Sequence, residues 1–433
     1  MAATSQDSAR MSSKKKITVT KGDDKPVLVP KLRFSGFDKP WSNDPLSKTL
    51  KEHKIKNTDG REVFSVSMEY GIVNQIELLG RSYAAADTSN YTVGRRFDVV
   101  YTKSPLKAFP FGIVKQCKFD GEVALSPLYG VFTPPNPYVG LMIEAYFEAP
   151  NRSKDFLAPL CQKGAKNTLQ ITNATFLSGS LPLPTQPTEQ KKIAECLSSV
   201  DELIAAQARK LDALKTHKKG LMQQLFPREG ETQPRLRFLE FQNAGDWVLQ
   251  RLDELAHYEN GKAHENNITE NGRYIVVNSK FISTEGEVRK FSNEGFCVAD
   301  EGDVLMVLSD VPNGRAIAKC FFVESDELYT VNQRICRIEP TKVNGKFLFY
   351  VLDRNSYFLN FDDGIKQTNL RKEDVVGFPL CAPTQHAEQK RIAECLTSLD
   401  DLIAANTQKL EALKTHKKGL MQQLFPSTEE VDA

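Results

Sequence analysis

The sequence predicts an α+β protein in which two blocks of mixed helix and strand are joined by a pair of long antiparallel coiled-coil helices. Three observations predict this fold. One segment occurs twice in the chain with little change. Each copy carries apolar residues at the average spacing of about 3.5 that is typical of a coiled coil. Each copy also follows a block of short β-rich runs separated by turn signals. The repetition predicts an internal duplication about a pseudo-twofold axis.

The repeated segment covers residues 189–227 and 388–426, which are identical at 31 of 39 aligned positions. The two copies begin 199 residues apart, whereas the repeats of solenoid proteins are about 20 to 50 residues long. A shorter motif is also repeated near the start of each block. The sequence Pro-x-Leu-Arg-Phe begins at Pro30 and again at Pro234, each with a tryptophan downstream. The chain is therefore a duplicated half-molecule in which a variable block precedes a nearly invariant segment.

The invariant segments are predicted to be helices, because their apolar residues alternate steps of three and four along the chain. Threonines before each copy signal helix starts, and Pro227 and Pro426 end the helices, since proline cannot continue one. Helices packed on a globular core are the alternative to a coiled coil. The seam residues expected to hold the helix pair together or to dock partner proteins are Ile193, Leu197, Ile204, Leu211, Leu214, Ile392, Leu396, Ile403, Leu410 and Leu413.

Polar residues interrupt both seams at equivalent positions. They are Gln207 and Lys218 in the first copy and Asn406 and Lys417 in the second. Buried polar residues on such a seam lower stability and fix the register of the helices. A helix of about 37 residues is about 55 Å long, which corresponds to on the order of 16 base pairs of B-DNA. A helix pair of that length is suited to act as a ruler.

Both variable blocks are predicted to be α+β domains with their own cores. Strands are expected at residues 97–101, 112–114, 274–277, 304–308 and 334–338, and helices at residues 139–147 and 347–352. Trp41 and Trp247 stand near the start of the two blocks, where we expect them to be packing anchors rather than base-stacking residues.

The composition indicates a folded protein, with 40% hydrophobic and 26% charged residues. No apolar run approaches the length of about 18 residues that a transmembrane helix needs, and residues 1–26 lack the apolar core of a signal peptide. We therefore expect a cytoplasmic protein without membrane contacts. None of the eight cysteines forms a C-x-x-C pair, which argues against zinc ribbons and redox motifs and favours buried free thiols.

No catalytic motif is visible in the chain. The phosphate-binding pattern G-x-x-x-x-G-K-[ST] and the dinucleotide pattern G-x-G-x-x-G are both absent, so ATP hydrolysis and Rossmann chemistry have no support. The six histidines show no metal-ligand spacing, so no metal site is predicted. Residues 133–138 approach the Asn-Pro-Pro-Tyr motif of adenine methyltransferases but lack its second proline, which favours an ordinary proline-rich loop. We therefore predict that this chain is not an enzyme.

Several of these patterns together resemble a known family. They are the E-Q-x-x-I-A-x-x-L helix openings at 189–197 and 388–396, the K-K-G-L-M-Q-Q-L-F-P closings at 218–227 and 417–426, and the G-I-K-Q-T-N loop at 364–369. In this order, and over nearly the whole chain after residue 30, they resemble the specificity subunit of Type I restriction-modification systems. The first block departs from the family pattern, since residues 164–168 read G-A-K-N-T without the glutamine.

The resemblance implies two target recognition domains, each reading one half of a bipartite, asymmetric site in double-stranded DNA. It also implies that the helices set the spacer between the half-sites and dock two modification subunits, which bind S-adenosylmethionine and methylate adenine at N6. Restriction subunits would add ATP-driven translocation and cleavage. No cofactor is expected on this chain itself, and S-adenosylmethionine, ATP and Mg are expected on the partner subunits.

The resemblance and the repeat boundaries together give an expected domain order. It is a flexible basic arm (1–29), a first target recognition domain (30–182), a first spacer helix (183–227), a second target recognition domain (228–380), a second spacer helix (381–426) and an acidic tail (427–433).

The residues expected to contact DNA lie in two corresponding loops, one in each block. Lysine and arginine neutralise phosphates, whereas lysine, arginine, asparagine and glutamine can read base edges. The candidates are Lys163, Lys166, Asn167 and Gln170 in the first block, and Lys366, Gln367, Asn369, Arg371 and Lys372 in the second. An ordinary solvated polar loop is the alternative for each. Weaker basic candidates are Arg95, Arg96, Lys103, Lys107, Lys115, Arg315, Arg334 and Arg337.

A second class of function remains open from the sequence, namely a non-enzymatic coiled-coil scaffold with two protein-binding domains. The net charge of +2 looks unpromising for a DNA-binding protein, but it averages unlike parts, since residues 1–180 carry +8 and residues 231–380 carry −6. An acidic second block must gather its cations on one face or rely on partner subunits to hold phosphates. We therefore expect the isolated chain to bind DNA weakly.

Overall fold

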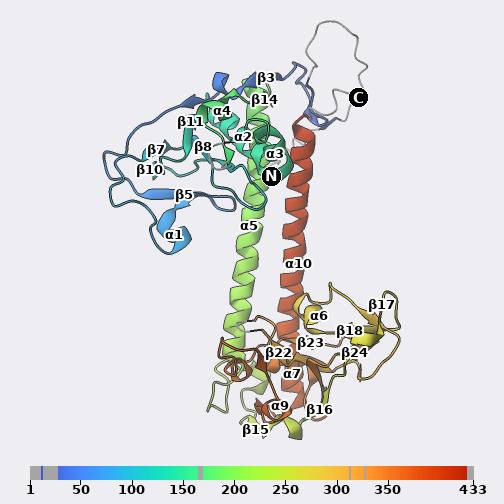
Figure 1. Cartoon of the computed structure of the whole chain (residues 1–433). Coiled ribbons are helices and arrows are strands. Elements are labelled where there is room, and N and C mark those ends of the chain that lie inside the picture. Colours follow the sequence, from blue (N-terminus) through green and yellow to red (C-terminus); the bar gives the residue numbers. More distant parts are fainter. Residues whose placement is uncertain (1–10, 13–27, 164–168, 312–313, 326–327, 427–433) are drawn as a thin grey trace, which may run out of the picture. The chain divides into compact units, whose positions relative to one another are not determined.

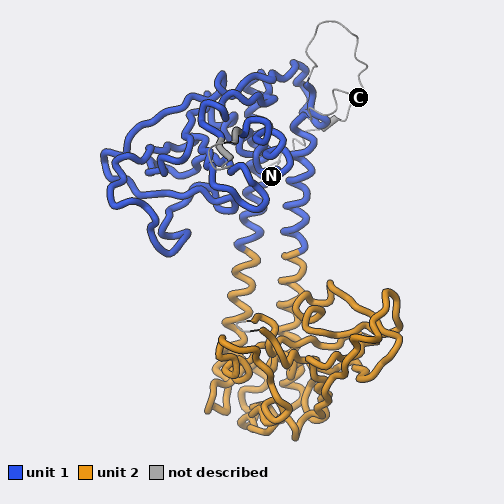
Figure 2. The backbone as a smooth tube through the Cα atoms, viewed as in Figure 1, with its two compact units in different colours: residues 1–209, 408–433 blue, residues 210–407 orange. Residues whose placement is uncertain are grey.

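A computed structural model of the whole chain (Figure 1) describes residues 11–12, 28–163, 169–311, 314–325 and 328–426. The predicted acidic tail and most of the predicted basic arm lie outside these residues. The chain divides into two compact units, which Figure 2 shows in different colours. Unit 1 consists of residues 1–209 and 408–433, and unit 2 consists of residues 210–407.

The two repeated segments are long helices, as predicted. They form α5 (Pro187–Leu225) and α10 (His386–Leu424), each of 39 residues and therefore each about 58 Å long. Helix α5 begins at a proline, which is suited to the first turn because its missing N–H has no partner there in any case. The boundary between the units crosses both helices (Figure 2), so each unit contains the first part of one helix and the last part of the other.

The variable block of unit 1 is built from two four-stranded sheets. One sheet has the order β6 (Gly71–Asn74), β5 (Val63–Ser67), β10 (Glu122–Leu125) and β7 (Thr92–Arg95), and the other has the order β4 (Lys51–Glu52), β11 (Gly130–Thr133), β8 (Val99–Thr102) and β9 (Ile113–Gln116). The helices of this block are α1 (Gln75–Leu79), α2 (Pro137–Glu148), α3 (Pro150–Leu157) and α4 (Asn173–Ser178). Helix α2 packs against strand β9.

The variable block of unit 2 has a similar plan. A four-stranded sheet has the order β16 (Ala256–Asn260), β25 (Ile335–Pro340), β21 (Val304–Val307) and β23 (Cys320–Phe322), and a five-stranded sheet has the order β17 (Ile268–Thr269), β19 (Phe291–Ser292), β18 (Tyr274–Val277), β24 (Tyr329–Val331) and β20 (Val298–Ala299). Its helices are α6 (Ser279–Ser283), α7 (Gly345–Leu352), α8 (Ser356–Leu359) and α9 (Lys372–Val376). Helix α7 packs against β21, β23 and β25.

Strand β21 shows why the apolar run of the second block is continuous. Val304 and Met306 belong to the core beneath α7, whereas Leu305 and Val307 belong to the core against the five-stranded sheet. Successive side chains of a strand point to opposite faces, so a strand buried on both faces is apolar at every position. Strand β8 of unit 1 follows the same rule, and the prediction of a separate core in each block is confirmed.

A two-stranded sheet connects each block to its repeat helix. In unit 1, β3 (Ser42–Pro45) pairs with β14 (Ser180–Leu183), and in unit 2, β15 (Val248–Arg251) pairs with β27 (Pro379–Ala382). In both units the first strand follows the tryptophan and the second leads into the repeat helix. The described structure therefore preserves the internal duplication even where the sequences have diverged.

The predicted strands and helices of the variable blocks are confirmed, with small shifts at their ends. One shift of two residues concerns the strand expected at 97–101, which begins only at Val99. Phe97 has a φ of 74°, a left-handed conformation that cannot continue a strand. All eight cysteines have free thiols, of which four are buried and four are half-buried. Within the described residues, no helix is long and apolar enough to cross a membrane.

Candidate nucleic-acid interface

Each variable block is fixed to its repeat helix by one buried carboxylate. In unit 1, Glu189 in the first turn of α5 is 1% exposed. It accepts two hydrogen bonds from the Arg33 guanidinium, at 2.7 and 2.8 Å, and one from the indole Nε1 of Trp41, at 3.2 Å. Because a buried carboxylate is costly without partners, these three donors account for an acidic residue in this position.

Unit 2 repeats the arrangement with equivalent residues. Glu388, also 1% exposed, accepts hydrogen bonds of 2.7 Å from both Nε and Nη2 of Arg237, and one of 3.3 Å from Nε1 of Trp247. Both tryptophans are buried, which confirms that they are packing anchors. The arginine of each Pro-x-Leu-Arg-Phe motif therefore binds the glutamate at the start of a repeat helix.

The glutamine that follows each buried glutamate contacts the N-terminal capping residue of a helix in the variable block. Gln190 donates a hydrogen bond to the carbonyl oxygen of Pro184, at 2.8 Å, and accepts one from the Asn136 side chain, at 3.1 Å. Asn136 also caps α2 by accepting from the N–H of Val139. In unit 2, Gln389 donates to the carbonyl of Pro383 and accepts from the backbone N–H of Asn344, the cap of α7. The E-Q pair therefore sets the position of each block.

The loop predicted to contact DNA in the second block is exposed and folded back on itself. Asp363 Oδ1 accepts the backbone N–H groups of Ile365 and Lys366, at 2.8 and 3.1 Å, and these hydrogen bonds lower the pKa of its carboxyl group. Gly364 takes a φ of 69° at the turn, which glycine adopts without strain. The side chain of Ile365 is 78% exposed at the tip of the turn.

Strand pairing joins this loop to a second segment of the same block. Thr368 and Asn369 form strand β26, which pairs with Ser309 and Asp310 of β22. The side-chain amide of Gln367 donates a hydrogen bond of 2.7 Å to the Ser309 hydroxyl. This hydrogen bond sets the orientation of the amide group, including its oxygen. Lys366, Gln367 and Asn369 are all exposed, which is compatible with their predicted role.

The two cations that follow the loop differ in their surroundings. Arg371 is exposed and forms an ion pair of 3.3 Å with Asp374 in the first turn of α9, which leaves its positive charge partly compensated. Lys372 is also exposed and lies 5.8 Å from the ring centroid of Tyr258. The structure thus gathers the five predicted residues of the second block in one segment, and their contact with DNA stays a prediction.

The corresponding loop of the first block is described only at its two ends. Strand β12 (Gln162–Lys163) pairs with β13 (Leu169–Gln170) in antiparallel register, with Lys163 opposite Leu169. Lys163 and Gln170 therefore lie on the two strands of a hairpin-like segment. Lys166 and Asn167 lie outside the described residues. The predicted roles of these four residues stay predictions.

Two of the weaker basic candidates are engaged inside the protein. Lys115 is 4% exposed and forms an ion pair of 3.0 Å with Glu148, and Arg337 forms ion pairs with Asp300 and Asp303. Neither is free to neutralise a phosphate. Arg95 pairs with Glu122, and Arg96 with Asp120, at the surface. The remaining candidates are exposed, namely Lys103, Lys107, Arg315 and Arg334.

The predicted seam residues are buried or half-buried in the two units. Ile193 and Leu197 belong to the core of unit 1, and Ile392 and Leu396 to the core of unit 2. The other six predicted seam residues are buried or half-buried, namely Ile204, Leu211, Leu214, Ile403, Leu410 and Leu413. Their predicted role in the helix packing is compatible with this burial, and their predicted role in docking a partner stays a prediction.

Two exposed leucines of the helices were missed by the sequence analysis. Leu203 is 56% exposed and Leu402 is 42% exposed, and they occupy equivalent positions of the two repeats. The sequence signal was available, because both copies keep a leucine off the seam, where a charged or polar residue is usual.

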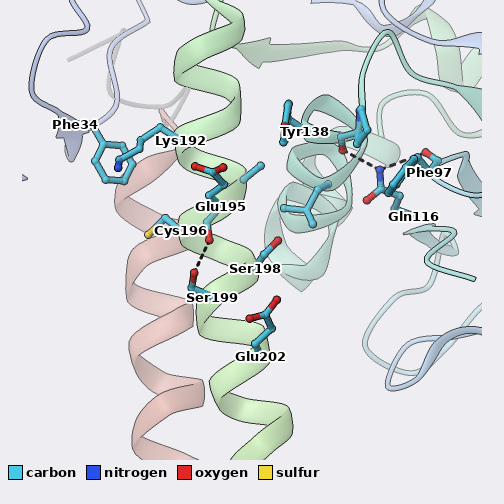
Figure 3. A pocket seen from close by; sticks show the side chains of 13 residues that line it. Phe34, Phe97, Gln116, Tyr138, Lys192, Glu195, Cys196, Ser198, Ser199 and Glu202 are labelled. Carbon is cyan, nitrogen blue, oxygen red and sulfur yellow. Dashed lines mark hydrogen bonds between the residues drawn. The ribbon is translucent and has the colours of Figure 1, made fainter. Parts of the chain in front are cut away.

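A groove also lies at equivalent positions in the two units. In unit 1 it has a volume of about 770 Å³ and lies between α5 and the start of α2, with Tyr138, Glu195 and Ser198 among its lining residues (Figure 3). In unit 2 a groove of about 350 Å³ lies between α10 and the start of α7. Ala393, Glu394, Thr397 and Ser398 line it at the positions that match the α5 lining of the first groove.

Comparison with known proteins relates this geometry to a family. Residues 244–415 match the family model of the Type I restriction modification DNA specificity domain. The chain is similar in sequence to Type I restriction-modification specificity subunits. The MjaVIII specificity subunit of a Type I restriction enzyme from Methanocaldococcus jannaschii is 28% identical over 271 residues. That alignment covers 59% of this chain and 63% of the relative's length.

Solved structures from Type I restriction-modification systems share the fold. The S subunit of a Type I restriction-modification system from M. genitalium aligns with a TM-score of 0.58 over 93% of this chain and 100% of that chain, at 14% identity. A chain from a study of complex assembly and conformational transition in the type I R-M system aligns with a TM-score of 0.50, over 89% of this chain and 98% of that chain, at 15% identity. The predicted fold class is therefore confirmed, since both similarities extend over nearly the whole chain.

Proposed function

We propose that this chain is the DNA sequence-recognition subunit of a Type I restriction-modification complex and carries no catalytic centre of its own. The observation that carries the proposal is the match of residues 244–415 to the DNA specificity domain, which includes the exposed loop at 361–372. The same arrangement of block and helix occurs in unit 1, so the second recognition element comes from the duplication. Within the described residues, no cluster of side chains could hold a metal ion.

Each variable block reads one half of a bipartite DNA site in this proposal. The blocks share their anchoring contacts but differ in the loops expected to meet the bases, since residues 366–369 read K-Q-T-N and residues 166–169 read K-N-T-L. Base identity is read by side chains placed in a groove of the duplex. Two unlike loops on two similar scaffolds are therefore expected to read an asymmetric pair of half-sites.

The helices α5 and α10 set the spacer between the half-sites and dock two adenine-N6 methyltransferase subunits. Two features support two copies of one partner: the equivalent exposed leucines and the equivalent grooves, both of which use the repeated sequence. A partner that recognises one copy of the repeat finds the same side chains in the other. S-adenosylmethionine is expected on these partners, and ATP and Mg on restriction subunits that join the complex.

The experiment that tests this function is DNA protection by the chain in complex with a methyltransferase subunit from its host. We expect the complex to protect one bipartite sequence, with binding that weakens steeply as salt rises, because phosphate contacts release counterions. The isolated chain is expected to bind more weakly. Absence of sequence-specific protection, together with capture of other proteins by the two blocks, would instead favour a coiled-coil scaffold with two protein-binding domains.

A further inference from the structure

One ion pair joins the two repeat helices inside unit 2. Lys218 of α5 lies 2.5 Å from the Asp400 carboxylate of α10, measured from Nζ to Oδ1. The other carboxylate oxygen accepts a hydrogen bond of 2.8 Å from the Tyr350 hydroxyl of α7. The lysine side chain is 22% exposed and the aspartate side chain 39%, so both charges are partly withdrawn from water.

Unit 1 contains the same ion pair with the helices exchanged. Lys417 of α10 lies 2.7 Å from Asp201 of α5 and 2.5 Å from Glu148 at the end of α2. Glu148 is held from its other side by Lys115, at 3.0 Å. Lys417 and Lys218 are the same position of the repeat, and so are Asp201 and Asp400. The duplicated chain thus forms one contact twice, each time between a lysine of one copy and an aspartate of the other.

The contact specifies one register of the antiparallel helices. A slip that keeps the seam intact moves one helix by a heptad of seven residues. Such a slip places Lys218 opposite Ala393 or Thr407, and it places Lys417 opposite an alanine in either direction. Neither lysine then meets a carboxylate, and a half-buried ammonium without its counter-charge is strongly destabilising. The apolar positions of the seam by themselves tolerate the slip, so the register depends on the polar positions, namely these lysines and the buried Gln207 and Asn406.

Both pairs also reach into the variable blocks. Glu148 belongs to α2 of the first block, and Tyr350 belongs to α7 of the second. In each unit, the lysine–aspartate pair that joins α5 and α10 therefore also contacts a helix of the variable block. In unit 1 the third group is the Glu148 carboxylate, which pairs with the lysine. In unit 2 it is the Tyr350 hydroxyl, which donates a hydrogen bond to the aspartate.

We propose that the Lys218–Asp400 and Lys417–Asp201 pairs are positioning residues that fix the spacer length between the two DNA half-sites. The proposal rests on the proposed function, and it adds that the spacer depends on the helix register in addition to the helix length. These four side chains would act without touching DNA. Their loss is expected to broaden the accepted spacers and to leave both half-site sequences unchanged.

The test uses the chain assembled with its methyltransferase partner. The recognised sequence is first read from the methylated sites of the wild-type complex. Duplexes are then made that carry both half-sites separated by the wild-type spacer, or by one base pair more or fewer. Methylation rates on the three duplexes give the spacer preference. For the variant Asp201→Ala/Asp400→Ala we expect at least a fivefold loss of preference for the wild-type spacer.

Three further variants make the result specific. The exchange Lys218→Asp/Asp400→Lys restores the unit 2 pair in reverse, and with unit 1 intact it should keep the wild-type preference, whereas Lys218→Asp alone should lower it. Lys218→Arg keeps the charge and should also keep the preference. Lys215→Ala removes an exposed lysine of the same helix and should have no effect. Circular dichroism identifies any variant that fails to fold, and the exchange and the arginine variant then decide the question.

Each outcome has a separate meaning. If the aspartate variants fold and keep the wild-type spacer preference, the proposal is overturned while the recognition function stands. The same holds if the reversed pair behaves like Lys218→Asp alone. If the wild-type complex methylates no bipartite sequence, the recognition function itself is wrong.

Discussion

The backbone N–H of Leu32 donates a hydrogen bond of 3.0 Å to the carbonyl oxygen of Gln423. A segment near the start of the chain thereby satisfies one of the free carbonyl groups at the end of α10. In unit 2, Leu236 makes the same contact with Gln224 of α5, at 2.9 Å. The Pro-x-Leu-Arg-Phe motif therefore joins the end of one repeat helix to the start of the other, through its leucine N–H and its arginine side chain.

The first prediction concerns the arginine of this motif. Replacing Arg33 by alanine leaves Glu189 buried with only the indole N–H as a donor, and loss of one partner of a buried ion pair costs about 3 to 5 kcal/mol. We expect a loss of this size in the free energy of unfolding of unit 1, measured by urea denaturation. Arg237→Ala should have the same effect on unit 2, because Glu388 has equivalent partners.

The two tryptophans make the measurement specific for each unit. Trp41 and Trp247 are the only tryptophans of the chain, so a Trp247→Phe background reports the unfolding of unit 1 alone by fluorescence. A matched control in unit 1 is Arg96→Ala, which removes an exposed arginine paired with Asp120 at the surface and should change stability by less than about 1 kcal/mol. An Arg33→Ala variant as stable as this control would contradict the anchoring role of Glu189.

The second prediction concerns the exposed loop of unit 2. Lys366→Ala should weaken binding similarly for all sequences and reduce the dependence on salt by about one phosphate contact, because a lysine ammonium neutralises a phosphate. Gln367→Ala should instead relax the preference at one base pair by about 1 to 3 kcal/mol. Binding of the methyltransferase complex to single-base variants of its site, at several salt concentrations, measures both effects.

The difference between the effects of Lys366→Ala and Gln367→Ala on DNA binding decides whether the loop contacts DNA. Lys342→Ala is a matched control, since Lys342 is an exposed lysine of the same block outside the loop. Equal and sequence-independent effects of Lys366→Ala, Gln367→Ala and Lys342→Ala would mean that the loop is an ordinary solvated segment.

The third prediction concerns the pH dependence of unit 1. Burial raises the pKa of Glu148, but Lys115 and Lys417 outweigh burial and leave that pKa below its ordinary value of 4.5. Burial lowers the pKa of Lys417, but Glu148 and Asp201 outweigh it and leave that pKa above 10.5. The carboxylate therefore contributes stability above about pH 4.5 that is lost in acid, and the ammonium contributes stability below about pH 10.5 that is lost in alkali.

A Glu148→Gln variant tests this assignment. Urea denaturation between pH 3 and pH 7 should show a lower stability at pH 7 and a weaker dependence on pH below about 4.5. Glu195→Gln is a control on the exposed face of α5. A Glu148→Gln variant with the wild-type pH dependence in acid would show that this carboxylate does not control the acid stability of unit 1.

The fourth prediction concerns the length of the repeat helices. Inserting one heptad into both α5 and α10 keeps the seam on one face and lengthens each helix by about 10 Å, which corresponds to about 3 base pairs of B-DNA. The preferred spacer should grow by that amount, and both half-site sequences should stay the same. Methylome sequencing of a host that carries the variant measures the spacer. An unchanged spacer would contradict the ruler function of the helices.

The sequence predicted the helices and their seam because a repeated heptad pattern is a local signal. It also singled out Lys218 and Lys417 as polar interruptions of the seam. Their partners could not be predicted, because Asp201 and Asp400 lie off the seam and meet the lysines only in one antiparallel register. Contacts between distant segments depend on the fold as a whole, which periodicity does not specify.

The anchoring glutamates show the same limit. Glu189 reads as an ordinary acidic residue in a first helical turn, where it is favourable in any helix. Only the structure shows that Arg33 and Trp41, which lie 156 and 148 residues earlier, donate to its carboxylate. The loop at 361–372 was found from its residue types, whereas its pairing with Ser309 was not, because β22 and β26 are too short to give a strand pattern.

The most direct test of two-part DNA recognition is the adenine methylome of the host after exchange of residues 42–180 for the first block of a related subunit. If each block reads one half-site, the wild type carries a split adenine motif that disappears when this chain is deleted. After the exchange, one half of the motif should change, while the other half and the spacer stay the same. A motif that survives the deletion, or an exchange that alters both halves or neither, would contradict two-part DNA recognition by this chain.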